Sequence, residues 1–219
     1  DVDTFAKYIL DLSLDAEKRQ RFAKNLYEKA SRLYSLDSMA DTQSRIYQNI
    51  MHLEHLPKRK EVLICGAYGK GNSGDEAILR SIIASMRSID PLLPLTVMTR
   101  KPEETRLLYG VRAIYTFNVP RFLRIAKRTK LFINGGGSLI QDSTSSRSLY
   151  FYLFTIRMAK LLGCPVMMYG CGIGPVTKPN NRRLASRVID RSAHTVTLRD
   201  PGSLQELQSM NVTRPKLIL

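Results

Sequence analysis

The chain has 219 residues, 43% of them hydrophobic, with 34 lysine and arginine residues against 19 aspartate and glutamate residues and a formal net charge of +15. This length is sufficient for one large domain, or for one domain with an appendage. The positive charge indicates either a solvated basic surface or an anionic partner, such as a phosphorylated substrate or a membrane surface. Aromatic residues are not interleaved with the basic patches, which argues against nucleic acid.

Cysteine usage and hydropathy point to the cytoplasm. Cys65, Cys164 and Cys171 form no CxxC pair and lie in or beside apolar runs, so buried free thiols in a reducing compartment are the default interpretation. We find no secretory signal and no apolar run near the roughly 18 residues that a membrane span needs. The chain starts at Asp1 and stops on a strand-like KLIL, so we expect a piece of a longer protein.

Residues 1–56 show helical patterns only and are expected to form a separate segment. An Asp N-cap, Asp15, precedes the second pattern. Apolar residues at helical spacing are Phe5, Ile9 and Leu12 in the first pattern, Phe22, Leu26, Ala30 and Leu33 in the second, and Met39, Ile46, Ile50 and Leu53 in the third. The charged, proline-led PKRK at 57–60 then forms a joint.

From residue 57 onward, short β-rich runs alternate with helical segments. The expected strands are 61–65, 95–99, 112–117, 130–134, 165–169, 194–198 and 216–219, with helices beginning near Gly74, Pro102, Val119, Thr144, Asn180 and Pro201. Continuous apolar strands at this spacing predict an α/β fold with a doubly wound, mostly parallel, Rossmann-like sheet. Residues 57–219 are therefore expected to be one such domain.

Glycine-rich loops follow four of these strands, at 66–76, 135–142, 170–175 and 199–203. In a parallel sheet the carboxyl ends of the strands meet at one edge, where ligands bind. Scattered structural glycines have no reason to gather there. The pattern therefore predicts a ligand site at this edge.

The first loop, GAYGKGNSGDEAIL at 66–79, fits one nucleotide motif and nearly fits another. Gly69, Gly71 and Gly74 make GxGxxG between a strand and a helix, as in dinucleotide-binding domains. The second strand ends in Arg100 rather than in the acidic residue that holds a ribose, which an NADP site tolerates. A triphosphate loop needs lysine where Asn72 stands.

Two carboxylates, Asp75 and Glu76, fall in the first turn of the following helix. They would repel a phosphate placed on the helix N-terminus, and they suit the helix dipole, so capping is one interpretation of both. The other is that Asn72 and Asp75 hydrogen-bond sugar hydroxyls, or that Asp75 takes a proton from one.

The later loops leave similar alternatives open. Gly135–Gly137 permit close backbone approach, either to a ligand or at a tight crossover. Arg147 is either an anion clamp or half of a surface salt bridge. Asp200 before Pro201 is a normal N-cap, and the role of Arg199 is open at this point. His52, His55 and His194 are not assigned to catalysis.

Four segments in order, GAYGKGNSGDEAIL (66–79), INGGGSLIQDSTSSRSLYFY (133–152), YGCGIGPV (169–176) and VTLRDPGSLQEL (196–207), resemble the polysaccharide pyruvyl transferases of the cell-wall type known as CsaB. The resemblance implies one half of a two-domain GT-B architecture. It further implies transfer of enolpyruvyl from phosphoenolpyruvate to a sugar of a bacterial wall polymer, closed into a 4,6-linked ketal, with neither metal nor nicotinamide cofactor.

The resemblance also implies roles for individual residues. Asn72 and Asp75 would face the acceptor sugar, and Arg147 would reach the donor. Asp75 and Arg147 are the expected catalytic residues, and the expected substrate-binding residues are Gly69, Asn72, Gly74, Glu76, Gly135, Gly136, Gly137, Ser138, Gln141, Asp142, Gly172, Gly174 and Arg199. The family's catalytic histidine lies in a second domain, so we expect the chain alone to be inactive. The acceptor would be a lipid-linked precursor at the inner membrane face.

The first 53 residues lie outside that resemblance and look like the C-terminal tail of a family 4 glycosyltransferase. The alternative is a helical extension that packs on the sheet. Two other functions stay open for the larger domain: an NADP-dependent oxidoreductase using GxGxxG, and a non-catalytic module whose basic face anchors it to an anionic membrane or polymer.

Overall fold

The structure is a computed structural model that describes residues 2–33, 40–41, 43–44, 59–143, 145–214 and 216–218. The chain divides into two units, residues 1–45 and 46–219, which are considered separately. The domain boundary expected after residue 56 lies outside the described residues, as does most of the third helical pattern, with Met39, Ile46, Ile50 and Leu53. None of the helices in these ranges is long and apolar enough to cross a membrane.

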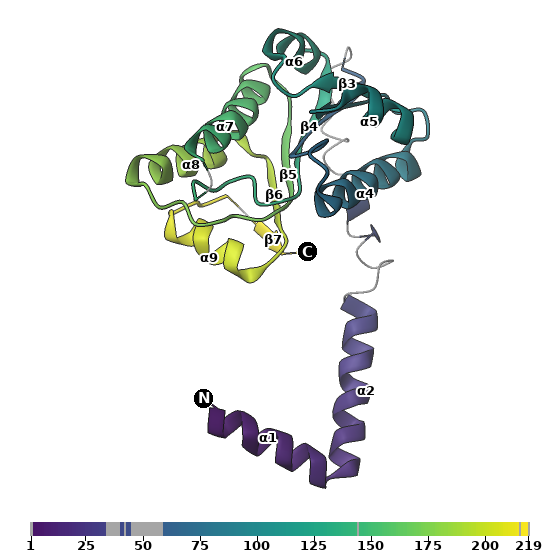
Figure 1. The fold of residues 1–219 in the computed structure, drawn as a ribbon, viewed down its shortest axis with the longest axis vertical. Coiled ribbons are helices and arrows are strands. Elements are labelled where there is room, and N and C mark those ends of the chain that lie inside the picture. Colours follow the sequence, from purple (N-terminus) through teal and green to yellow (C-terminus); the bar gives the residue numbers. More distant parts are fainter. Residues whose placement is uncertain are drawn as a thin grey trace. The chain divides into compact units, whose positions relative to one another are not determined.

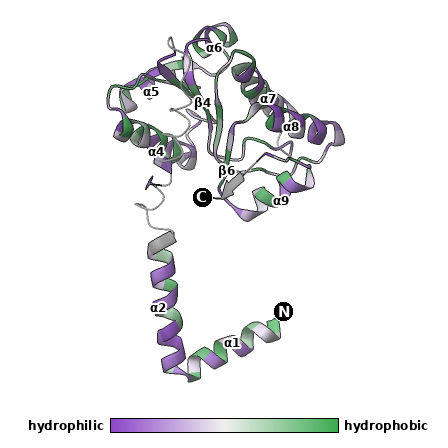
Figure 2. Cartoon of the chain, turned by 180° about the vertical axis from the view of Figure 1, so that it is seen from behind, coloured by the Kyte–Doolittle hydropathy of each residue, from purple (hydrophilic) through white to green (hydrophobic). Residues whose placement is uncertain are grey.

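The first unit contains helices α1 (Val2–Leu14) and α2 (Ala16–Leu33). Asp15 separates them, and its carboxylate accepts a hydrogen bond from the Lys18 N–H at 2.8 Å, which confirms the predicted N-cap of the second helix. Hydrophobic and hydrophilic residues are interspersed along both helices (Figure 2), consistent with amphipathic helices.

The second unit is an α/β domain built on a parallel sheet (Figure 1). Its strands are β1 (Glu61–Cys65), β2 (Leu95–Thr99), β3 (Arg112–Tyr115), β4 (Thr129–Gly135), β5 (Val166–Cys171), β6 (Thr195–Leu198) and β7 (Lys216–Ile218). All seven lie within three residues of their predicted limits, and the order is β3-β2-β1-β4-β5-β6-β7. This order, with every pairing parallel, confirms the predicted Rossmann-like fold.

The connecting helices begin within two residues of the predicted positions. They are α4 (Ser73–Ile89), α5 (Pro102–Tyr109), α6 (Val119–Ala126), α7 (Ser146–Leu161), α8 (Pro179–Ser192) and α9 (Pro201–Ser209). Asn72, Asn118, Ser145 and Asp200 each accept a backbone hydrogen bond at a helix start. These caps satisfy N–H groups that have no partner within the helix.

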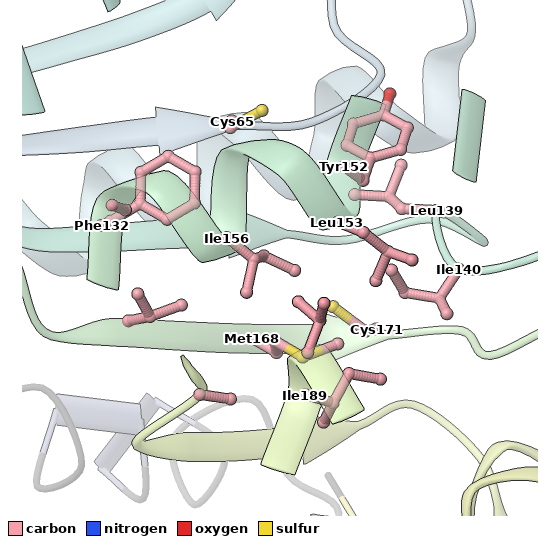
Figure 3. Close-up of a cluster of buried hydrophobic side chains, with 14 of the residues drawn as sticks. Cys65, Phe132, Leu139, Ile140, Tyr152, Leu153, Ile156, Met168, Cys171 and Ile189 are labelled. Carbon is pink, nitrogen blue, oxygen red and sulfur yellow. The ribbon is translucent and has the colours of Figure 1, made fainter. Parts of the chain in front are cut away.

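Two hydrophobic layers hold the helices on the sheet. On one face, α4 packs against Val62, Ile64 and Leu131. On the other, α6, α7, α8 and α9 cover a larger cluster. Figure 3 shows this second layer, where Leu153 and Ile156 of α7 lie beside Met168 of β5. Because alternate residues of a strand point to opposite faces, β1 contributes to both layers.

Candidate active site

The direction in which successive strands are added to the sheet changes between β1 and β4. These strands are neighbours, but the chain continues from β1 toward β2 and from β4 toward β5. The loops that leave their carboxyl ends, 66–72 and 136–143, therefore diverge. In open α/β sheets such a point is where ligands bind, and both loops are glycine-rich, as predicted.

The loop after β1 is held by three hydrogen bonds, one of them buried and two partly buried. The Tyr68 hydroxyl, on a side chain only 1% exposed, donates to the Gly135 carbonyl at 2.8 Å. The Gly69 N–H donates to the Glu76 carboxylate at 2.7 Å, and the Tyr109 hydroxyl donates to the same group at 3.0 Å. Glu76 thus braces the loop, and Gly69 and Glu76 do not line the pocket that contains Asp75.

The loop after β4 lies directly on α4. Gly136 and Gly137 have φ angles of 66° and 68°, in the left-handed region that favours glycine. A Cβ on Gly136 would lie 2.4 Å from Ile78 Cγ2, and one on Gly137 would lie 2.7 Å from Asp75 Oδ1. The close packing of the loop on α4 therefore requires glycine at both positions. It also places the backbone of the loop next to the Asp75 carboxylate.

The loops after β4 and β5 run side by side. Gly172 N–H donates to the Gly137 carbonyl at 2.9 Å, and Gly174 N–H donates to the Ile140 carbonyl at 3.0 Å. A Cβ on Gly172 would lie 2.7 Å from Arg199 Cζ, and one on Gly174 would lie 2.7 Å from the Gln141 side chain. These two glycines make room for Arg199 and Gln141.

Asp142 fastens the end of the β4 loop to the start of α8. Its buried carboxylate accepts hydrogen bonds from the Thr177 N–H (2.8 Å) and hydroxyl (3.0 Å), the Lys178 N–H (3.1 Å) and the Asn181 amide (2.8 Å). Burial acts to raise the pKa of this carboxyl, but these hydrogen bonds hold the pKa well below its usual range. Asp142 does not line the pocket beside Asp75.

A pocket of about 580 Å³ opens where the loops after β1, β4 and β6 meet; we call it the Asp75 pocket, and Gly172 and Gly174 of the β5 loop do not line it. Among its lining residues are Asn72, Gly74, Asp75, Gly137, Ser138, Gln141 and Arg199, all predicted as site residues. Asn72 Oδ1 accepts from Gly74 N–H at 2.9 Å, so Asn72 caps α4 and Asp75 is not needed as its cap. The Asp75 carboxylate makes no hydrogen bond to any residue that the structure describes.

The environment of Asp75 favours its protonated form more than water does. Burial raises the pKa of this carboxyl above its ordinary value, and the neighbouring Glu76 adds to the increase. Lys70 and Arg199 act in the opposite direction without cancelling it. A carboxylate with a raised pKa and unused oxygens is suited to accept a proton from a hydroxyl group.

A second pocket of about 400 Å³, the anion pocket, adjoins the first. The two share lining residues from the β1 loop and α7, including Lys70, Ser148 and Tyr152. Lys70, Arg100 and Arg147 line the anion pocket, and no aspartate or glutamate is among its lining residues. The Arg100 guanidinium lies 4.1 Å from the centre of the Phe117 ring, which holds it without neutralising it.

Arg147 is therefore placed beside the Asp75 pocket but not in it. Within the described residues its side chain has no ion pair or hydrogen bond, so the salt-bridge interpretation finds no support. Lys70 and Arg100 were missed as site residues by the sequence analysis. Arg100 directly follows the carboxyl end of β2, and Lys70 lies within the glycine-rich loop after β1, so the positions of both residues at this edge of the sheet could have indicated them.

Other reactive groups lie apart from these pockets. Cys65, Cys164 and Cys171 are buried free thiols, as predicted, and burial raises the pKa of each to about 12, which keeps them protonated. His194 Nδ1 accepts from the Val166 N–H at 2.9 Å. In the described parts of the chain, no group of three or more histidine, cysteine, aspartate or glutamate side chains is arranged to hold a metal.

Comparison with known proteins identifies the family of this fold and site. A search of curated proteins found no match. The profile of the polysaccharide pyruvyl transferase family matches residues 72–219. The match starts at the cap of α4, so it contains Asp75, the β4 and β5 loops, Arg147 and Arg199, while Lys70 lies just before it. The chain belongs to the polysaccharide pyruvyl transferase family.

Proposed function

We propose that the Asp75 pocket and the anion pocket together bind a sugar and phosphoenolpyruvate, for transfer of the enolpyruvyl group to a cell-wall polysaccharide. The observation that carries this proposal is the pairing itself. A carboxylate with unused oxygens stands in one pocket, and the adjoining pocket has three cationic side chains and no acidic one. A sugar hydroxyl needs the first, and a donor with both phosphate and carboxylate needs the second.

The chemistry requires a proton acceptor for the sugar and cations for the donor. Protonation of the methylene carbon of phosphoenolpyruvate leaves a cationic centre at the carbon that bears the phosphate. A sugar hydroxyl attacks this carbon and gives up its proton, which we assign to Asp75. The carbon–oxygen bond to phosphate then breaks, phosphate leaves, and a second hydroxyl attacks the same carbon and loses its proton to close the ketal.

The proposed roles follow from position. Arg147, Lys70 and Arg100 bind the phosphate and carboxylate of the donor and stabilise the charge on the departing phosphate. Ser138, Gln141 and Asn72 contribute hydrogen-bonding groups toward the acceptor. The acid that protonates the methylene carbon is not assigned within these pockets; the family resemblance implies a histidine of a second domain.

The acceptor class is the finer part of the proposal. The resemblance to the CsaB type favours an amino sugar of a secondary wall polymer and a 4,6-linked ketal, with the acceptor carried on a lipid at the inner membrane face. The NADP alternative is less consistent with the site, since Asp75 lies in the first turn of α4, where the dinucleotide fingerprint would place a pyrophosphate.

The proposal is tested by product analysis. The complete protein is incubated with phosphoenolpyruvate and an N-acetylmannosamine-containing acceptor, and mass spectrometry follows the acid-labile pyruvate ketal together with released phosphate. Equal amounts of ketal and phosphate are expected, and both should form far more slowly in Asp75→Asn. Product formation with NADPH and no phosphoenolpyruvate would contradict the proposal.

A further inference from the structure

A third pocket lies at the opposite edge of the sheet from the candidate active site. Its volume is about 510 Å³, and it is lined by residues at the amino ends of three strands: Glu61 begins β1, Thr96 is near the start of β2, and Arg112 begins β3. Figure 1 shows β3 beside α5 and α6, which contribute the remaining wall. Nothing in the proposed transfer reaction uses this edge.

Five arginines line this arginine pocket, namely Arg106, Arg112, Arg121, Arg124 and Arg128, against one carboxylate, Glu61. Glu61 is already engaged, because it accepts from the Thr96 hydroxyl at 3.0 Å and lies 3.7 Å from Arg112 Nη1. Arg106 is paired with Glu103 at 2.6 Å. The lining residues therefore have an excess of positive charge that the engaged carboxylates do not balance.

Three of these arginines lack any partner in the described parts of the chain. The side chains of Arg121, Arg124 and Arg128 are exposed, and no described carboxylate or carbonyl accepts a hydrogen bond from them. Their spacing of three and four residues places them along one side of α6 and its C-terminal extension. Three guanidinium groups are thus presented together toward one concavity.

The helix dipole does not account for this arrangement. Arg106 and Arg124 lie in the last turns of α5 and α6, where the negative end of the dipole favours a cation. Arg121, by contrast, lies in the first turn of α6, where the dipole disfavours one. Like charges gathered around a concavity repel one another and raise the local potential, which attracts anions.

We propose that the arginine pocket binds a phosphate-bearing anion with at least two phosphate groups close together, separate from the transferase site. The guanidinium fork matches phosphate oxygens in pairs, and Arg121, Arg124 and Arg128 have their forks free for this purpose. The same chemistry is offered by a soluble oligophosphate and by clustered phospholipid headgroups. This inference does not depend on the proposed pyruvyl transfer.

The test compares two triple variants of equal charge change. R121Q/R124Q/R128Q removes the free arginines of the pocket. R183Q/R187Q/R191Q removes three exposed arginines of α8 that do not line the pocket. Binding of tripolyphosphate is measured by isothermal titration calorimetry at low salt. Sedimentation with phosphatidylglycerol–phosphatidylcholine vesicles, and with phosphatidylcholine vesicles alone, examines the lipid source. Thermal midpoints confirm that both variants fold.

We expect the pocket variant to lose at least about tenfold in affinity for tripolyphosphate, for anionic vesicles, or for both, since each lost contact is a charge-assisted hydrogen bond. The α8 variant should stay within about twofold, as expected for charges outside the site. Loss in the anionic-vesicle arm alone identifies the lipid as the source. Equal loss in both triple variants, or no binding of either probe by the unmodified chain, would overturn the proposal.

Discussion

Substituting Gly136 by alanine tests how closely the β4 loop lies on α4. This contact positions Gly137 and Ile78, which line the Asp75 pocket. The residue has φ 66°, which costs a residue with a Cβ about 1–2 kcal/mol. The new Cβ would also lie 2.4 Å from Ile78 Cγ2 and 3.0 Å from Ile78 Cβ. Because Ile78 Cβ is fixed by the helix backbone, relief requires a backbone shift costing about 1–3 kcal/mol. The sum predicts a loss of about 2–5 kcal/mol.

Urea unfolding of the chain measures this loss, with Gly71→Ala as the matched control. Gly71 has a similar φ of 80°, but no atom lies within 4 Å of its Cβ position, so it should lose only about 1–2 kcal/mol. In a double-mutant cycle, Ile78→Ala should recover part of the Gly136→Ala loss. Equal losses at the two glycines, or no coupling to Ile78, would refute the close contact.

Two further substitutions test a structural role for Asp142 and a chemical role for Asp75. Asp142→Asn turns an amide donor toward groups that now donate to the carboxylate, and it should cost about 2–4 kcal/mol in urea unfolding at neutral pH. Because the pKa of Asp142 is lowered in the fold, its carboxylate stabilises the fold at pH values above its unfolded-state pKa of about 3.9. This stabilisation is lost as pH falls below that pKa, so the free energies of unfolding of the unmodified chain and Asp142→Asn should become more similar in acid. Asp75→Asn should lower the transfer rate of the complete protein about 10²–10⁴-fold and leave phosphoenolpyruvate affinity within about threefold. The unmodified rate should fall as pH drops through the raised pKa of Asp75, at a higher pH than for an ordinary aspartate.

Two results would contradict these predictions for Asp142 and Asp75. A loss for Asp142→Asn that stays constant down to strongly acidic pH would mean that the carboxylate is not the source of the stability. Unchanged transfer by Asp75→Asn would return this residue to a purely structural role at the start of α4.

The fold could be predicted from local patterns because each strand is a largely apolar run and helical segments alternate with the strands. Asp200 before Pro201 caps α9 as expected, whereas the cap of α6 at Asn118 was not predicted. The glycine-rich loops predicted the edge of the sheet at which the Asp75 pocket lies. The run predicted as a strand from Arg112 to Phe117 pairs only to Tyr115, because Phe117 leaves the sheet to pack on Phe151.

The sequence could not show which polar residues hold the loops in place and which ones face the pocket. Asp75 and Glu76 are adjacent, yet Glu76 is occupied by Tyr109, which is 33 residues away, while Asp75 faces the pocket. Likewise Gln141 lines the pocket and Asp142 binds the start of α8. Which side-chain oxygen atoms hold the loops in place depends on contacts between segments that are distant in the sequence. The anion pocket likewise combines residues from distant segments, including Lys70, Arg100 and Arg147, so the structure was needed to find it.

The most direct test of the central claim is a calorimetric titration of the chain with phosphoenolpyruvate. Arg147→Gln removes a cation from the anion pocket, and Arg183→Gln removes an exposed arginine of α8 as the control. We predict saturable binding that weakens at least about tenfold in Arg147→Gln, the effect of losing one charged hydrogen-bonding partner. The control and R121Q/R124Q/R128Q should bind as the unmodified chain does. No binding, or equal affinity for the unmodified chain and Arg147→Gln, would contradict the account.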